Sequence, residues 1–104
     1  MLLELIFVAQ SILPALLAEA DSRNEAFVAC LFSTSRDARS NDLSAQHFEQ
    51  KLSSACRAEE EELRSVSVRV LQLRGHSAAD AADQTAKLLS DARRSVVTAY
   101  RQPF

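Results

Sequence analysis

The sequence predicts an all-α protein: a helical hairpin over residues 22–39 and 44–74, a third helix over 78–101, and an apolar segment in front. Three observations carry this prediction. The 104 residues include one glycine and two prolines, which leaves little turn material for a sheet. Alanine, leucine, arginine and glutamate, which favour helices, are abundant. Apolar residues recur at spacings of three and four, as in helices with one buried face.

Residues 1–20 form an apolar run whose end resembles the cleavage box of a secretory signal, with small residues at Ala18 and Ala20. The absence of lysine and arginine from this stretch, and the charge of Glu4, argue against a signal. The alternative is a first core helix, kinked at Pro14. Contact with a membrane is expected only through this segment, if it is retained.

The next predicted helix, over 22–39, opens with a capping box in which Ser22 and Glu25 each satisfy a backbone amide of the other. Phe27, Cys30 and Leu31 share its apolar face. The polar run that follows predicts a turn before residue 43. Residues 21–104 are therefore predicted to form a single small helical domain.

The longest predicted helix runs from Ser44 to Arg74. Ser44 is a good N-cap, and Leu43 and Phe48 sit at the two positions of a hydrophobic staple. Gly75 is suited to the left-handed conformation that ends a helix. Its apolar stripe, with one wider gap, comprises Phe48, Leu52, Ala55, Cys56, Leu63, Val66, Val70 and Leu73.

The last predicted helix begins after Ser77, which with Asp80 repeats the capping-box pattern. It ends near Arg101, before Pro103. Many residues on its apolar face are alanine, so it can approach its neighbours closely while burying little area.

The charge of the chain excludes some classes of partner. Two of the 14 acidic residues and none of the 12 basic ones fall in residues 1–20, so the rest of the chain is formally neutral. Because there is no basic excess, binding to nucleic acid is not expected.

Cys30 and Cys56 lie on apolar faces of the two hairpin helices, within about one helical turn of being level. A disulfide between them closes a loop of 26 residues, worth roughly 3.5 kcal/mol in the chain-entropy model. The alternative is a pair of buried thiols. The compartment decides between them, because disulfides persist in oxidising surroundings.

No set of residues indicates catalysis, a metal or a cofactor. The acidic run 59–62 is interpreted as a solvated helix face, with Glu59 alone near the apolar stripe. His47 and His76 lie about thirty residues apart in sequence and share no further ligands, so a metal site is not predicted. Because no nucleophile can be paired with a base, we expect the protein not to be an enzyme.

The segments Phe27-Val28-Ala29-Cys30-Leu31 and Ser54-Ala55-Cys56-Arg57-Ala58-Glu59 resemble a pattern in small uncharacterised exported helical proteins of proteobacteria. In that family a leader precedes two or three helices, with one cysteine in each of the first two. The resemblance implies export and a cysteine pair, and carries no known activity.

The sequence therefore predicts a small periplasmic or secreted protein that acts by binding a protein partner. The alternative is a cytoplasmic four-helix bundle, able to form a homodimer, whose first helix completes the core. The binding surface is expected where the alanine-rich last helix leaves apolar side chains of the hairpin uncovered. The candidate groove residues are Phe27, Leu31, Phe48, Leu52, Glu59 and Leu63.

Overall fold

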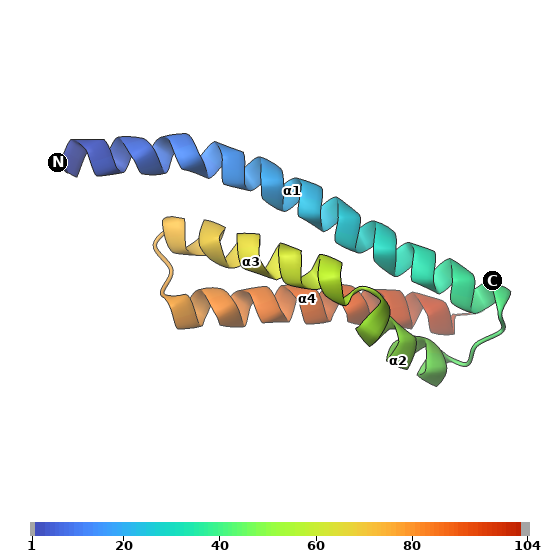
Figure 1. The fold of residues 1–104 in the computed structure, drawn as a ribbon. Helices are drawn as coiled ribbons and strands as arrows, with labels where there is room; N and C mark the ends of the chain where they lie inside the picture. The colour runs from blue at the N-terminus through green and yellow to red at the C-terminus, as the bar shows by residue number, and fades with distance from the viewer. Residues whose placement is uncertain (1, 103–104) are drawn as a thin grey trace.

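The computed structural model describes the backbone of residues 2–102 and the side chains of residues 12–102. It contains four helices: α1 (Leu2–Ser40), α2 (Ala45–Ala55), α3 (Arg57–Leu73) and α4 (Ala78–Arg101). The molecule is a rod of 60 × 22 × 22 Å. In Figure 1, α1 runs along the top, and α3 and α4 form an antiparallel pair beneath it. The all-α class is confirmed.

Helix α1 is continuous over 39 residues, so the predicted helix start near residue 22 is wrong. Ser22 lies in the middle of α1 and does not cap it. Pro14 also lies inside the helix, although proline removes one backbone hydrogen bond. Burial compensates for this loss, because Leu16 packs in the core and Leu13 and Leu17 pack against it. The side chains of residues 1–11 lie outside the described part.

The predicted single helix over 44–74 is two helices, α2 and α3, which meet at Cys56. Cys56 leaves the helical region of backbone conformation, with φ −110° and ψ 21°. Its side chain is joined to Cys30 of α1, and the Cα atoms of the two cysteines are 5.9 Å apart. The change of axis lets Phe48 and Leu52 of α2 bury themselves in the same core as α3. In sequence, the break coincides with the wider gap in the apolar stripe.

The predicted helix caps on either side of the α3–α4 turn are confirmed in part. Gly75 has φ +100°, and the His76 amide donates to the carbonyl of Leu71 over 3.0 Å. The hydroxyl of Ser77 accepts from the Asp80 amide over 3.1 Å. Ser44 likewise caps α2, accepting from the amide of the third helical residue. These bonds satisfy backbone groups that a helix end leaves unpaired.

The turn between α1 and α2 uses Asp42 in the left-handed region, with φ +53°. The Asp42 amide donates to the carbonyl of Arg39, and the Leu43 amide donates to that of Ala38. This is the Schellman pattern that Gly75 makes after α3, with an aspartate where glycine is preferred.

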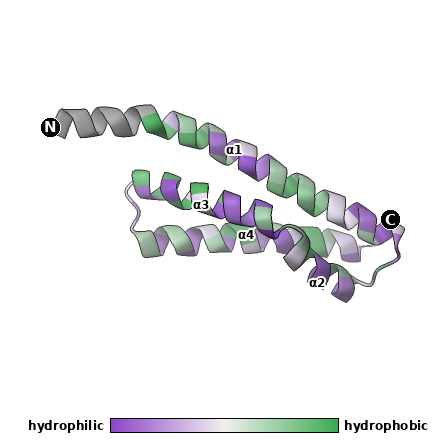
Figure 2. Cartoon of the chain, viewed as in Figure 1, coloured by the Kyte–Doolittle hydropathy of each residue, from purple (hydrophilic) through white to green (hydrophobic). Residues whose placement is uncertain are grey.

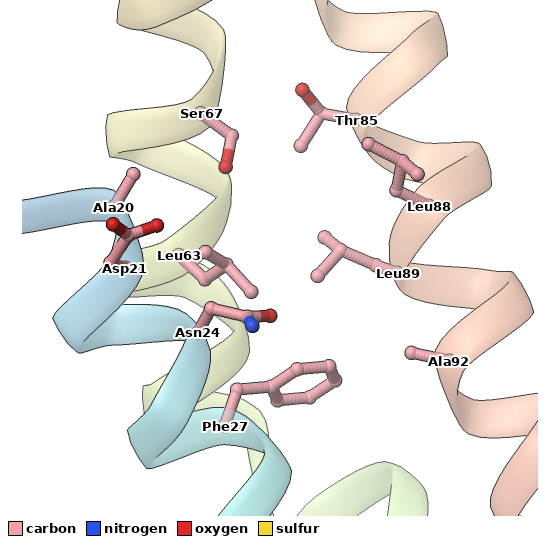
Figure 3. Close-up of a pocket in the computed structure, with 10 residues that line it drawn as sticks. All are labelled: Ala20, Asp21, Asn24, Phe27, Leu63, Ser67, Thr85, Leu88, Leu89 and Ala92. Atoms are coloured by element: carbon pink, nitrogen blue, oxygen red, sulfur yellow. The ribbon is translucent and has the colours of Figure 1, made fainter. Parts of the chain in front are cut away.

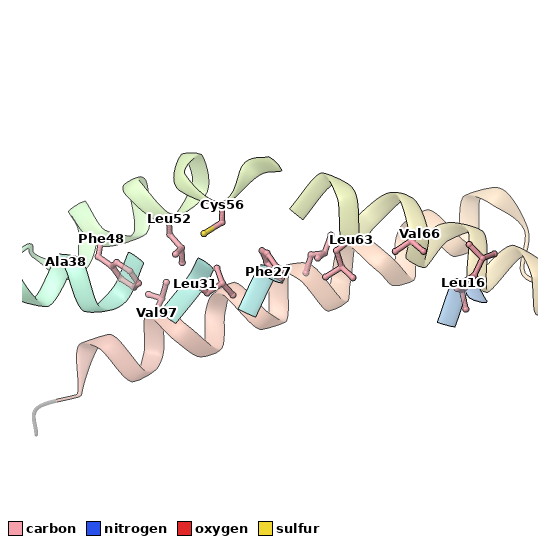
Figure 4. Close-up of a cluster of buried hydrophobic side chains, with 12 residues drawn as sticks. Leu16, Phe27, Leu31, Ala38, Phe48, Leu52, Cys56, Leu63, Val66 and Val97 are labelled. Atoms are coloured by element: carbon pink, nitrogen blue, oxygen red, sulfur yellow. The ribbon is translucent and has the colours of Figure 1, made fainter. Parts of the chain in front are cut away.

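The core is one elongated cluster rather than a compact ball. Figure 4 shows it extending from Leu16 at one end to Phe48 and Val97 at the other. Hydrophilic and hydrophobic residues alternate along α3 and α4 in Figure 2, as expected for helices with one buried face. The buried apolar residues of this core cluster are Leu16, Phe27, Leu31, Ala38, Phe48, Leu52, Cys56, Leu63, Val66, Val70, Leu89 and Val97.

Candidate interaction surface

An apolar cleft of about 290 Å³ lies where α1, α3 and α4 meet. Figure 3 shows the side chains of Phe27, Leu63 and Leu89 pointing toward one another from the three helices. Apolar side chains that converge from separate elements are typical of binding clefts. The lining residues are Ala20, Asp21, Asn24, Phe27, Leu63, Ser67, Thr85, Leu88, Leu89 and Ala92.

Small side chains keep the cleft open. Ala20 of α1 and Ala92 of α4 occupy positions where a longer side chain would extend into the space between the helices. Leu88, beside them on α4, is 66% exposed. A large leucine left this exposed beside an apolar cleft adds to the surface that a partner can cover.

Thr85 places a polar atom in the apolar lining. The residue is 1% exposed, and its hydroxyl oxygen has no hydrogen-bond partner among the described protein atoms. An unpaired buried hydroxyl costs roughly 1–3 kcal/mol. The hydroxyl oxygen itself has almost no accessible surface, so this cost is carried by the folded chain.

Ion pairs tie the helices together beside the cleft. Arg23 of α1 bonds to Glu62 of α3 over 2.8 Å. Glu60, whose side chain is only 14% exposed, pairs with Arg93 of α4 and lies 3.6 Å from Arg64. The interpretation of residues 59–62 as a uniformly solvated face is therefore wrong for Glu60, which joins α3 to α4.

The predicted groove residues divide between the cleft and the closed core. Phe27 and Leu63 line the cleft. Leu31 and Phe48 are buried in the core and line none of the open surface described above. Leu52 is buried but borders a polar hollow between α2 and α4. Glu59 does not line the cleft. It is half-buried, and one of its carboxylate oxygens is buried without a hydrogen-bond partner.

Several cleft residues were not in the predicted set. Leu88 immediately precedes the buried Leu89 on α4, but it falls outside the predicted apolar face and was expected to be an ordinary surface residue. Ser67 and Asn24 are polar, so a search for apolar residues at helical spacing does not find them. The many alanines of α4 did predict that part of α3 would be left uncovered. They did not show which residues would line the resulting cleft.

The hollow between α2 and α4 contains three arginines, and each has a carboxylate partner. Arg93 pairs with Glu60, while Arg94 lies 3.7 Å from Asp91 and Arg101 lies 3.5 Å from Glu49. Their charges are thus compensated within the chain. This hollow is a weaker candidate for binding an anionic partner than its arginine content suggests.

His76 and Asp80 form a polar cluster at the start of α4. The His76 Nδ1 lies 2.6 Å from an Asp80 carboxylate oxygen, and Gln84 donates to the same oxygen over 3.0 Å. Hydrogen bonds from these two side chains lower the pKa of Asp80 below its usual 3.8. Within the described residues, no group of three or more His, Cys, Asp and Glu side chains gathers to hold a metal.

No family model, curated protein or solved structure matches the chain. The resemblance to small exported two-cysteine proteins stays a prediction. In the part of the chain that the structure describes, no helix combines the length and hydropathy needed to cross a membrane.

Proposed function

We propose that the protein is a small exported, non-enzymatic binding protein that holds a protein partner in the cleft between α1, α3 and α4. The observation that carries the proposal is the apolar lining of the cleft, beside which Leu88 is left 66% exposed. An apolar partner side chain that enters this cleft buries apolar area of its own and of the cleft lining.

Two observations support export. The end of the apolar segment, at Ala18 and Ala20, resembles a signal cleavage box. The disulfide between Cys30 and Cys56 suits an oxidising compartment such as the periplasm. It also stabilises a rod whose small core leaves it in need of a covalent link.

The test uses a photo-crosslinking amino acid in the full chain, expressed in a bacterial host that exports it. We expect a discrete protein adduct when the group replaces Leu88, and none when it replaces Arg94, which is exposed and does not line the cleft. Intact mass of the same samples should begin at Asp21 and show two hydrogens fewer than the dithiol. A full-length mass with two free thiols, or no adduct at either position, contradicts the proposal.

One observation favours a second candidate function, a four-helix bundle that retains residues 1–20. Leu16 is only 5% exposed and belongs to the core cluster. On this interpretation α1 is a permanent part of the fold, and the protein stays in the cytoplasm. A chain lacking residues 1–20 then fails to fold, whereas an exported domain folds without them.

A further inference from the structure

We propose that residues 13–20 mask the binding surface in the full chain, and that an amphipathic helix of the partner takes their place once they are removed. This inference rests on the proposed function, since it requires export and cleavage after Ala20. It adds the class of the partner segment and predicts that the unprocessed chain binds the partner more weakly than the processed one.

Residues 13–20 of α1 pack on α3 as a docked helix would. The α3 surface beneath them, which includes Val66 and Val70, is called the seat. Leu16 is a core residue, and Leu13, Leu17 and Ala20 pack against the same cluster. The ion pair between Arg23 and Glu62 sets the register of the antiparallel helices. Because the helices are antiparallel, Leu16, seven residues before Arg23, comes level with the residue seven positions after Glu62, which adjoins Val70.

The surface beneath this segment is apolar. Val66 and Val70 of α3 are 2% and 7% exposed in the full chain. Figure 4 places Leu16 beside Val66 at the same end of the core. Removing residues 1–20 takes away Leu13, Leu16, Leu17 and Ala20, which pack in or against the same cluster as the two valines, and we expect this to raise the exposure of the valines. Their exposure is unfavourable, because each buried valine contributes ~1.5–3 kcal/mol of hydrophobic free energy.

The uncovered surface continues into the cleft. Ala20, the last residue of the segment, is also a wall of the cleft that Leu63 and Thr85 line. Loss of the segment thus joins the two features into one groove along α3 and α4. A groove between two helices, with a valine floor, accepts a helix and offers no strand edge for pairing.

The seated segment itself indicates what the partner helix looks like. Its apolar side chains, at 13, 16, 17 and 20, follow the spacing of one helix face. Glu19 lines a small hollow with Arg23 and Arg69 at the rim of the seat. The partner segment is therefore an amphipathic helix with leucine-like residues three and four apart and an acidic residue flanking them.

The experiment uses the full chain and a fluorescent peptide of residues 12–24 as the probe. Leu16→Asp places a charge in the seat and drives the segment off. Ile12→Asp is the matched control, because Ile12 is 40% exposed on the same segment. We expect the peptide to bind the Leu16→Asp chain about tenfold more tightly than the wild type or the control. Adding Val70→Asp should abolish that binding.

Three outcomes overturn the inference. One is a folded, disulfide-bonded Leu16→Asp chain that binds the peptide no better than the control. Another is binding that survives Val70→Asp. The third is dimerisation of the Leu16→Asp chain in sedimentation equilibrium, which makes a second copy the occupant.

Leu16→Ala covers the case in which Leu16→Asp does not fold. It loosens the segment without burying a charge, and we expect a smaller gain in peptide affinity of about threefold. A folded Leu16→Ala chain with wild-type affinity contradicts masking and leaves α1 as a fixed core helix.

The result separates this inference from the proposed function. If an adduct forms at position 88 but the peptide does not bind, the proposed function stands and the masking inference fails. If the peptide binds but no adduct forms, residues 13–20 do cover a helix-binding surface, and the proposed function fails.

Discussion

The ring of Tyr100 in α4 stacks on the ring of Phe48 in α2, with centroids 4.2 Å apart and planes inclined by 23°. The Tyr100 hydroxyl donates to the carbonyl of Leu43 in the α1–α2 turn. The Arg39 guanidinium lies 4.8 Å from the centre of the Tyr100 ring and donates to the Ala99 carbonyl. One aromatic residue thus holds three chain segments together at this end of the rod.

Tyr100→Phe should lower the free energy of unfolding by about 1 kcal/mol, because it removes the hydrogen bond and keeps the stacked ring. Tyr100→Ala removes both and should cost about 2–3 kcal/mol. Urea denaturation of the two variants measures the difference. Equal losses would show that the ring stacking contributes nothing measurable.

Asp42→Gly should raise the free energy of unfolding by about 0.5–1 kcal/mol. The φ of +53° strains an aspartate and suits a glycine, which offsets the greater freedom that glycine has when unfolded. The matched control is Gly75→Ala, where φ is +100° and the substitution should destabilise. Thermal unfolding of both variants shows whether each substitution raises or lowers stability. A destabilised Asp42→Gly variant contradicts the explanation from backbone strain at residue 42.

Replacing both Cys30 and Cys56 with alanine should cost about 3.5 kcal/mol, the loop-closure value for a 26-residue loop. Comparing the wild type in oxidised and reduced form by denaturation gives the same quantity without a change of sequence. A loss below about 1 kcal/mol would mean that packing alone fixes α2 against α1.

Stability should fall at acid pH partly because of Asp80. Its pKa is lowered in the folded chain, so its contribution is complete above the usual value of 3.8 and is lost as pH falls through the folded pKa. Asp80→Asn removes this contribution and should flatten the pH dependence of the midpoint denaturant concentration below pH 4. An unchanged acid profile in Asp80→Asn argues that the cluster with His76 has no energetic effect.

Local signals predicted the last helix and the caps well, because they act within a few residues. Ser44, Gly75 and Ser77 each satisfy backbone groups of a neighbouring turn, and the structure places all three as caps. The helix rise placed Cys30 and Cys56 at similar heights, which made a disulfide geometrically possible but left a pair of buried thiols as the alternative; the structure has the disulfide.

Tertiary packing overrode the local signals elsewhere. Ser22 and Glu25 form a good capping pattern, yet α1 runs through them, because Leu16 before them and Phe27 after them are buried in one core. The break at Cys56 is not encoded in helix propensity. It arises because α2 must turn to reach α1 and α4, which single-helix periodicity does not describe.

The cleft was the hardest feature to predict. Its walls come from three helices, and six of its ten lining residues are polar or small. Only Phe27 and Leu63 of the expected groove line it, because the apolar stripe that predicts a groove equally predicts a core.

The rod shape affects how the protein behaves in solution. The Cα radius of gyration is 16.9 Å, whereas a compact chain of this length has about 13 Å. The monomer should therefore elute from a gel-filtration column ahead of globular standards of 11.5 kDa and resemble a dimer. If the chain is cleaved after Ala20 as proposed, the rod shortens, and the elution shift on cleavage should exceed what the lost mass explains. Light scattering, which reports mass independently of shape, is the measurement that separates a long monomer from a true pair.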